Sequence, residues 1–247
     1  KINYDALAPK FSILWSIINK PMAISYGTSI ITDNIICCLD PANPGSNVGN
    51  NILRDMSGNG NDATLNNGSI SSSAYTTVNS SDGAVLSLDG PSIWTLSMLL
   101  TRTGAVTGSV GRIAGTNGVI DRGEIAIGLA SWAGVSDRIY LNGPRASWTQ
   151  TDVTIELNET AYLCFIFDRT QASSPNALIY KNGILEWSAT QTGGDEGPIT
   201  GYTLGSRSDF NGEYVPHSFH HVTVHDKALS ANEIAANFEA IRRRVNL

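Results

Sequence analysis

The sequence predicts an all-β fold, an antiparallel β-sandwich followed by one short C-terminal helix. Charged residues make up only 15% of the 247 residues, and small polar residues with 24 glycines take their place, a composition typical of short strands and tight turns. Short β-type runs recur along the chain, separated by Asn-Gly or Gly-Gly pairs. No helical crossover lies between the runs, so neighbouring strands should be antiparallel.

The strands follow from these runs in chain order. The clearest hairpin is ALIYKNGILEW, in which Asn182-Gly183 is the dipeptide that favours a type I′ turn. The other turn pairs lie at 117–118, 142–143, 193–194 and 211–212. The expected strands are residues 34–39, 84–88, 94–100, 124–129, 138–141, 153–157, 162–167, 177–180, 202–205 and 219–225.

One helix is predicted, and it comes last, in SANEIAANFEAIRRR. Ser230 is the expected N-cap, and Glu233 three residues later completes a capping box. Ile234, Phe238 and Ile241 then form one apolar stripe at helical spacing.

Composition excludes several classes of function. A net charge of -6 argues against nucleic-acid binding, which brings a basic stripe; the three arginines at 242–244 match the negative end of the helix dipole instead. No apolar run is long enough to predict a membrane span. Cys37, Cys38 and Cys164 are an odd number, so we expect three unpaired thiols, at least two of them in the core, and no disulfide scaffold.

The Gly- and Asn-rich stretch DMSGNGNDATLNNG, residues 55–68, is either a turn or a calcium loop. Asp55, Ser57 and Asn59 match positions 1, 3 and 5 of an EF-hand loop, but Asn66 stands where the bidentate Glu belongs. In the turn, Asp55 and Asn59 would bond their own backbone, and the glycines would supply positive φ. The turn is the preferred interpretation, and a weak calcium site at Asp55, Ser57 and Asn59 stays open.

Four histidines lie close together in VPHSFHHVTVHD. In a regular strand His217, His221 and His225 would share one face, and His220 would face the other way. Neighbours on that face would stand about 13 Å apart, so a zinc ion would need ligands from another strand as well.

Glycan binding would need aromatic side chains at the surface. Trp132, Trp148 and Trp187 fall near turns and are the candidates for stacking on a sugar ring. For each of them, packing in the core is the alternative.

The search for catalytic groups predicts that the chain is not an enzyme. A glycosidase of the common kind needs two carboxylates close together, but Glu124 and Glu156 are isolated, and Asp195 and Glu196 lie in a Gly-rich turn. A G-x-S-x-G motif for a serine nucleophile is also missing.

Three segments carry a resemblance to a known family. The first segment is SIITDNIICCLDPANPGSNVGN followed by LRDMSGNGNDATLNNG and AVLSLDG, the second is ALIYKNGILEWSAT, and the third is YTLGSRSDFNGEYVPHSFHHVTVHDKALSANEIAANFEAIRRR. Together they resemble the concanavalin A-like, laminin-G-like jelly-roll domains of tailed-phage structural proteins. The resemblance covers roughly residues 24–244. It implies a jelly-roll sandwich at residues 22–247 and a virion structural protein of the capsid or tail, located on the virion surface.

Residues 1–21 fall outside the resemblance and are expected to form an N-terminal arm. Because the arm is too apolar to be left in water, we expect it to dock on another subunit of a homo-oligomer or on another virion protein. Its apolar residues are Phe11, Ile13, Leu14, Trp15, Ile17 and Ile18. The alternative function is recognition of host-surface glycans, since members of the wider fold can bind glycans and calcium at the loop rim.

Overall fold

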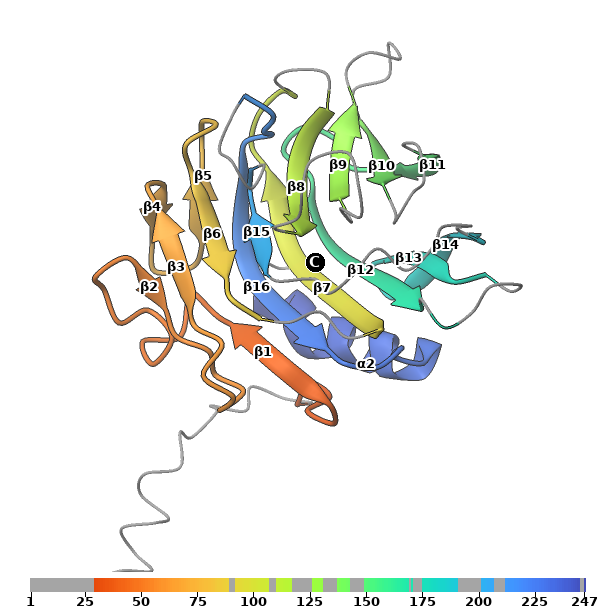
Figure 1. Ribbon diagram of the computed structural model, residues 1–247, viewed down its shortest axis with the longest axis horizontal. Helices are drawn as coiled ribbons and strands as arrows, with labels where there is room; N and C mark the ends of the chain where they lie inside the picture. Colours follow the sequence, from red (N-terminus) through yellow and green to blue (C-terminus); the bar gives the residue numbers. More distant parts are fainter. Residues whose placement is uncertain are drawn as a thin grey trace, which may run out of the picture.

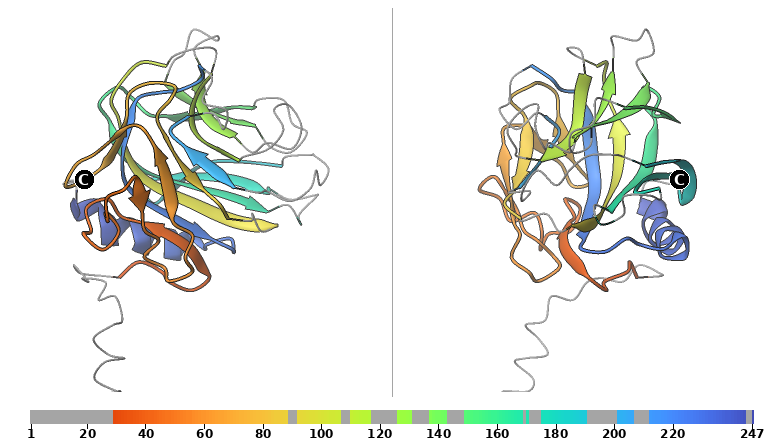
Figure 2. Two further views of the ribbon diagram at one scale, coloured as in Figure 1. Left: turned by 60° about the vertical axis from the view of Figure 1, so that its left-hand side comes forward. Right: turned by 45° about the vertical axis from the view of Figure 1, so that its right-hand side comes forward.

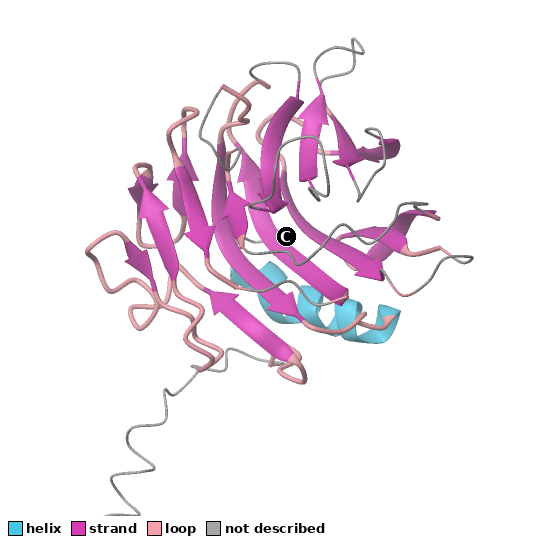
Figure 3. Ribbon diagram, viewed as in Figure 1, coloured by secondary structure: helices cyan, strands magenta, loops and turns pink. Residues whose placement is uncertain are grey.

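The computed structural model describes residues 29–88, 92–106, 110–116, 126–130, 137–142, 149–168, 170, 175–190, 201–206, 212–244 and 247. In these ranges the chain forms two antiparallel eight-stranded sheets and one α-helix, so the predicted jelly-roll sandwich with a C-terminal helix is confirmed (Figures 1 and 3). The predicted arm, with Phe11, Leu14, Trp15, Ile17 and Ile18, lies outside the described residues. None of the described helices is long and apolar enough to cross a membrane.

The first sheet, sheet A, has β16 near its centre, and the ten-residue strand β7 lies beside it. The N-terminal part of β16 pairs with β5 on the other side, and its C-terminal part pairs with β1, so the first and last strands of the sandwich are neighbours. In spatial order the sheet consists of β14 (Ile184–Ala189), β13 (Ala177–Lys181), β12 (Thr160–Asp168), β7 (Ile93–Arg102), β16 (His217–His225), β5 (Tyr75–Thr77) and β4 (Ser69–Ile70), with β1 (Ile35–Leu39) on β16.

The second sheet, sheet B, covers the inner face of sheet A (Figure 2). The chain passes from sheet B to sheet A between β3 and β4, and returns between β5 and β6. In spatial order sheet B consists of β11 (Thr149–Thr154), β10 (Arg138–Asn142), β9 (Ala126–Ala130), β8 (Val110–Thr116), β15 (Tyr202–Leu204), β6 (Gly83–Leu86), β3 (Ala63–Asn66) and β2 (Ile52–Leu53).

The main core fills the space between the sheets. Along β12 the inward residues Leu163, Phe165 and Phe167 alternate with residues that face the other way, as the two-residue period of a strand requires. The ring of Trp94 on β7 lies 4.7 Å from that of Phe167 and 5.7 Å from that of Tyr202, so it bridges the two sheets. Burying each such side chain stabilises the fold by about 2 kcal/mol.

The helix α2 (Ala231–Ile241) packs on the outer face of sheet A and is followed by the 3₁₀ turn η2 (Arg242–Arg244). Its buried Ile234 and Ile241 join a second cluster with outward residues of β7, β12 and β13. The predicted capping box is confirmed: the Ser230 hydroxyl accepts from the Glu233 N–H, and the Glu233 carboxylate accepts from the Ser230 N–H at 2.8 Å.

The predicted turn at Asn182-Gly183 is also confirmed, since both residues have positive φ, 51° and 82°, as a type I′ turn requires. The turn lies against α2, and a Cβ on Gly183 would stand 3.3 Å from the Phe238 ring.

None of the three cysteines forms a disulfide, and all three are buried, as predicted. Cys37 lies in the core between the sheets, and Cys164 lies in the cluster under α2. Burial raises the pKa of both thiols, that of Cys164 to about 12, so both remain protonated near neutral pH.

Candidate functional site

The stretch singled out as a calcium loop or a turn folds around the carboxylate of Asp55, which is 6% exposed. Its Oδ1 accepts hydrogen bonds from the backbone N–H groups of Cys38 and Ser57, both at 2.8 Å. Its Oδ2 accepts from the Ser57 hydroxyl at 2.7 Å and from the Asn61 N–H at 3.1 Å. One carboxylate therefore joins β1 to the loop and satisfies four donors.

Asn59 also points back to the protein, since its amide donates to the carbonyl of Ile35 at 2.9 Å. The two glycines of the loop, at 58 and 60, have φ values of 89° and 78°, as a turn needs. Among the described residues, no group of three or more His, Cys, Asp or Glu is placed to hold a metal ion. These contacts support the turn interpretation, and calcium at Asp55, Ser57 and Asn59 stays a prediction.

The four histidines lie in β16, where a β-bulge at His220 breaks the alternation that the sequence predicted. The pairing with β7 shifts by one residue between Phe219 and His221. His217 consequently faces the inner core, with its ring 4.4 Å from that of Phe219, while His221 and His225 face outward. The prediction that His217, His221 and His225 share one face is therefore wrong, because one extra residue reverses the parity of the strand.

The three other histidines contact different partners. The Nε2 atom of His220 lies 2.8 Å from the Thr101 hydroxyl, that of His221 lies 3.7 Å from the Cys38 sulfur, and that of His225 lies 3.0 Å from the carbonyl oxygen of Ile31. Burial lowers the pKa of His220, and it lowers that of the core residue His217 to about 4. These rings therefore do not converge on one metal position.

Of the three tryptophans proposed to stack on a sugar, only Trp187 lies in the described residues. It is half-buried on β14 and packs against the main core, as the alternative interpretation expects. Trp132 and Trp148 lie outside the described residues, so the sugar-stacking role of the three stays a prediction.

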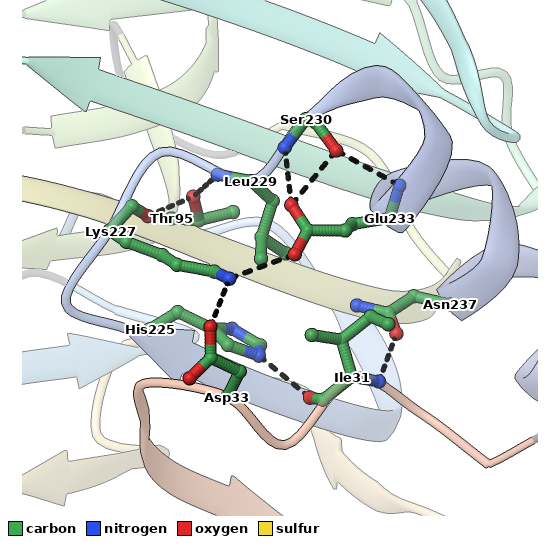
Figure 4. A network of polar contacts seen from close by, with 9 residues as sticks. All are labelled: Ile31, Asp33, Thr95, His225, Lys227, Leu229, Ser230, Glu233 and Asn237. Carbon is green, nitrogen blue, oxygen red and sulfur yellow. Dashed lines mark hydrogen bonds and ion pairs between the residues drawn. The ribbon is translucent and has the colours of Figure 1, made fainter.

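A polar network at the start of α2 ties the helix to the sandwich (Figure 4). Lys227 donates to Asp33 at 2.7 Å and to Glu233 at 2.8 Å, and its bond lowers the pKa of Glu233 to about 2. The Ile31 N–H donates to the Asn237 side chain at 2.6 Å, which holds the segment before β1 on the helix. These charged groups are paired with one another, so we assign the network a structural role.

A depression lies where the two connections between the sheets, the β3–β4 turn and the β5–β6 turn, run side by side. Its volume is about 440 Å³, and it is a shallow depression that is open to solvent rather than an enclosed pocket. We call it the rim depression, and it is lined by Asn67, Gly68, Ser69, Val78, Asn79, Ser81 and Asp82.

The two turns of the rim depression are fixed to each other and to a buried tyrosine. The Tyr75 hydroxyl donates to the carbonyl of Gly83 at 2.9 Å and lies 3.2 Å from that of Asn67. The Asn67 amide donates across the turns to the carbonyl of Ser81 at 3.1 Å. Gly68 has φ 69° and passes so close to Tyr75 that an added Cβ would lie 2.7 Å from its ring, so the turn needs glycine there.

Asp82, 1% exposed, organises the β5–β6 turn. Its Oδ2 accepts the N–H groups of Val78 and Asn79 at 2.8 and 3.2 Å, whereas its Oδ1 accepts no hydrogen bond from the described residues. Asn79 Oδ1 accepts the N–H and the hydroxyl of Ser81 at 2.9 and 2.5 Å. The rim depression thus offers amides and hydroxyls beside Val78, whose apolar side chain is 59% exposed, while the Asp82 carboxylate lies buried beneath the turn.

No family model matches the chain, and no curated protein matches it in sequence. Solved structures do match in shape. A sialidase of Trypanosoma rangeli in complex with 2,3-difluorosialic acid is 15% identical with a TM-score of 0.67, over 98% of this chain and 40% of the sialidase chain. The receptor-binding domain of botulinum neurotoxin C/D mosaic serotype is 13% identical with a TM-score of 0.63, over 85% of this chain and 52% of that domain.

These likenesses show the fold alone. The chain spans about 40% of the sialidase chains and about half of the toxin domains that it resembles. They agree with a concanavalin A-like sandwich, the fold that the sequence segments implied.

The prediction that the chain is not an enzyme is wrong, because chains that share this fold include sialidases, which are enzymes. The exclusion rested on the missing pair of carboxylates. Sialidases use a tyrosine nucleophile, and the rule of two carboxylates does not apply to them. The criterion was therefore too narrow to exclude catalysis.

Sequence reasoning missed the rim depression. Asn67-Gly68 and Asp82-Gly83 are visible as turn signals on either side of Tyr75. Their proximity, however, follows from the pairing of β3 with β6 and of β4 with β5, which no local pattern states.

Proposed function

We propose that this chain is a carbohydrate-binding β-sandwich domain that recognises glycans, such as those of a host cell surface. The rim depression carries the proposal, because hydrogen-bonding groups of both polarities surround an exposed apolar side chain in a fixed concavity. A sugar presents the matching features, hydroxyl groups around a ring with apolar C–H faces. The same fold in a sialidase solved with sialic acid adds support.

A glycan array probed with the intact chain tests the proposal, once with calcium and once with a chelator. We expect binding to a defined glycan, and a blank array under both conditions would refute the function. Binding that disappears in chelator would support the calcium prediction at Asp55, Ser57 and Asn59.

A second candidate is a structural protein of a phage virion, exposed on the capsid or tail as a homo-oligomer and held to other virion proteins by residues 1–21. The observation in its favour is the sequence resemblance at both ends of the domain. The matching segments form the loop that joins β1 to β3 and the closing unit of β16 and α2. The two functions are compatible, since a virion surface protein can also bind glycans.

Deleting residues 1–21 tests the second candidate. The truncated chain should stay folded by circular dichroism and lose its oligomeric mass by light scattering. An unchanged oligomer after the deletion would contradict the anchoring role of Phe11, Leu14, Trp15, Ile17 and Ile18.

A further inference from the structure

A row of hydroxyl groups crosses the outer face of sheet A. Its members stand opposite one another in neighbouring strands, so each hydroxyl lies beside the next. The residues that alternate with them, such as Leu100 and Phe219, point into the core. All members of the row are exposed or half-buried, so the row is accessible from outside. From β4 to β12 the row consists of Ser69, Thr76, Ser218, Thr101 and Thr160.

The β-bulge of β16 brings an imidazole to this row. His220 is the extra residue of the bulge, and the pairing with β7 skips it. Its half-buried ring lies with Nε2 2.8 Å from the Thr101 hydroxyl and Nδ1 3.1 Å from the carbonyl oxygen of Ser73. Bulges are frequent next to active sites, where they re-aim one side chain. This one places His220 between the row and the β4–β5 turn.

The hydrogen bonds decide which nitrogen of His220 can take up a proton. Burial lowers the pKa of the ring, so it is neutral near neutral pH. Because the Ser73 carbonyl can only accept, Nδ1 carries the hydrogen and donates, and Nε2 is an acceptor. The Thr101 hydroxyl therefore donates to Nε2, and the Thr160 hydroxyl donates to the Thr101 oxygen at 2.7 Å. A hydroxyl held against a base that a third group orients is the arrangement of an activated nucleophile.

We infer that Thr101 is a nucleophile for small carboxylic esters, with His220 as its general base. The Thr101 oxygen attacks the carbonyl carbon of the ester, and its proton passes to His220 Nε2. The bond between the carbonyl carbon and the alcohol oxygen then breaks, and His220 returns the proton to that oxygen. The alcohol leaves, and the acyl group stays on Thr101 as an ester.

Water completes the cycle with the same two residues. It attacks the acyl carbon and gives a proton to His220 Nε2, and the bond to the Thr101 oxygen breaks as that oxygen takes the proton back. The products are a carboxylic acid and an alcohol, so no oxidant or further reactant is needed. The Thr160 hydroxyl is a donor within reach of the carbonyl oxygen as it becomes negative. This activity lies apart from the rim depression and does not depend on the proposed carbohydrate binding.

The test is reaction of the full chain with p-nitrophenyl acetate. Absorbance follows the release of p-nitrophenolate, and mass spectrometry of an acid-quenched digest locates the acetyl group. We expect acetylation of Thr101. Thr101→Val keeps the shape of the side chain without its hydroxyl and should lower the release to the level of chemical background. His220→Gln removes the base and should slow the acetylation of Thr101 by about a hundredfold or more.

Thr76→Val is the matched control. Its hydroxyl belongs to the same row but bonds the Ser218 hydroxyl at 2.8 Å instead of an imidazole, so this variant should react like the parent. Circular dichroism checks that all three variants stay folded. Release by Thr101→Val at the parent rate, or acetyl groups on lysines alone, would overturn the assignment. Acetylation of Thr101 at the parent rate in His220→Gln would overturn the role of the imidazole, and none of these results depends on the outcome of the glycan array.

Discussion

Replacing His217 with glutamine should remove much of the acid sensitivity of the folded chain. His217 is 1% exposed, and its ring lies beside Phe219 and packs among Leu129, Ile155 and the buried Arg102. Burial lowers the pKa of the imidazole from its ordinary value of 6.5 to about 4, since a charged ring would have no water around it.

The sign of the effect follows from proton uptake. Between pH 6.5 and about 4 the unfolded chain carries the proton on His217 and the folded chain does not, so the free energy of unfolding falls as the pH falls. The difference between the two pKa values corresponds to a loss of about 3 kcal/mol in the free energy of unfolding once His217 is protonated in both states. Roughly 2 kcal/mol of this is already lost at pH 4.5.

Urea denaturation of both proteins at pH 7.0 and pH 4.5 measures this difference. The His217→Gln variant should lose roughly 2 kcal/mol less than the parent on acidification, while His220 and His225 titrate alike in both. Leu129→Ala, a change in the same cluster of side chains but without a titrating group, should lower the free energy of unfolding equally at both pH values. Equal acid losses in the His217→Gln variant and the parent would refute the reasoning.

Five further substitutions have defined outcomes in thermal or denaturant unfolding. Ser230→Ala removes the capping box and should lower the free energy of unfolding by about 1 kcal/mol. Ile234→Ala, at a fully buried position, should lower it by about 2–4 kcal/mol. Gly205 has φ 93°, and an added Cβ would lie 2.7 Å from a threonine side chain, whereas Gly60 has φ 78° and open space around it. Gly205→Ala should therefore lower the free energy of unfolding more than Gly60→Ala, and equal losses would contradict the steric argument. Asp55→Ala leaves four donors without their acceptor and should lower the free energy of unfolding by about 3 kcal/mol. A rise in the melting temperature of the parent on adding calcium would favour the metal interpretation of that loop instead.

The elements with strong local signals were predictable. Ser230 and Glu233 mark the start of α2 because capping chemistry is local, and Asn182-Gly183 marks a hairpin because few residues accept positive φ. The long strands β7 and β12 were found because they are apolar enough to be buried on both faces.

The elements without such signals were missed or misplaced. β3, β4 and β5 are short and rich in Ser, Thr and Asn, and they become strands through pairing with distant partners. The strand expected at 153–157 is Thr149–Thr154, since the chain turns after Ile155, where Glu156 N–H bonds the Glu159 side chain. The bulge at His220 has no sequence signature, yet it decides which histidines meet the core.

The position of β16 has a consequence for how the chain is made. During synthesis β7 emerges long before β16, so the edge of β7 that pairs with β16 stays open until residues 217–225 leave the ribosome. β1 and β5 wait for the same strand, because both pair with it on its other side. In a nascent chain that stops short of His217, the β14-β13-β12-β7 part of sheet A, the β5-β4 pair and β1 would therefore be separate, and completion of the last strand joins all three in one late step.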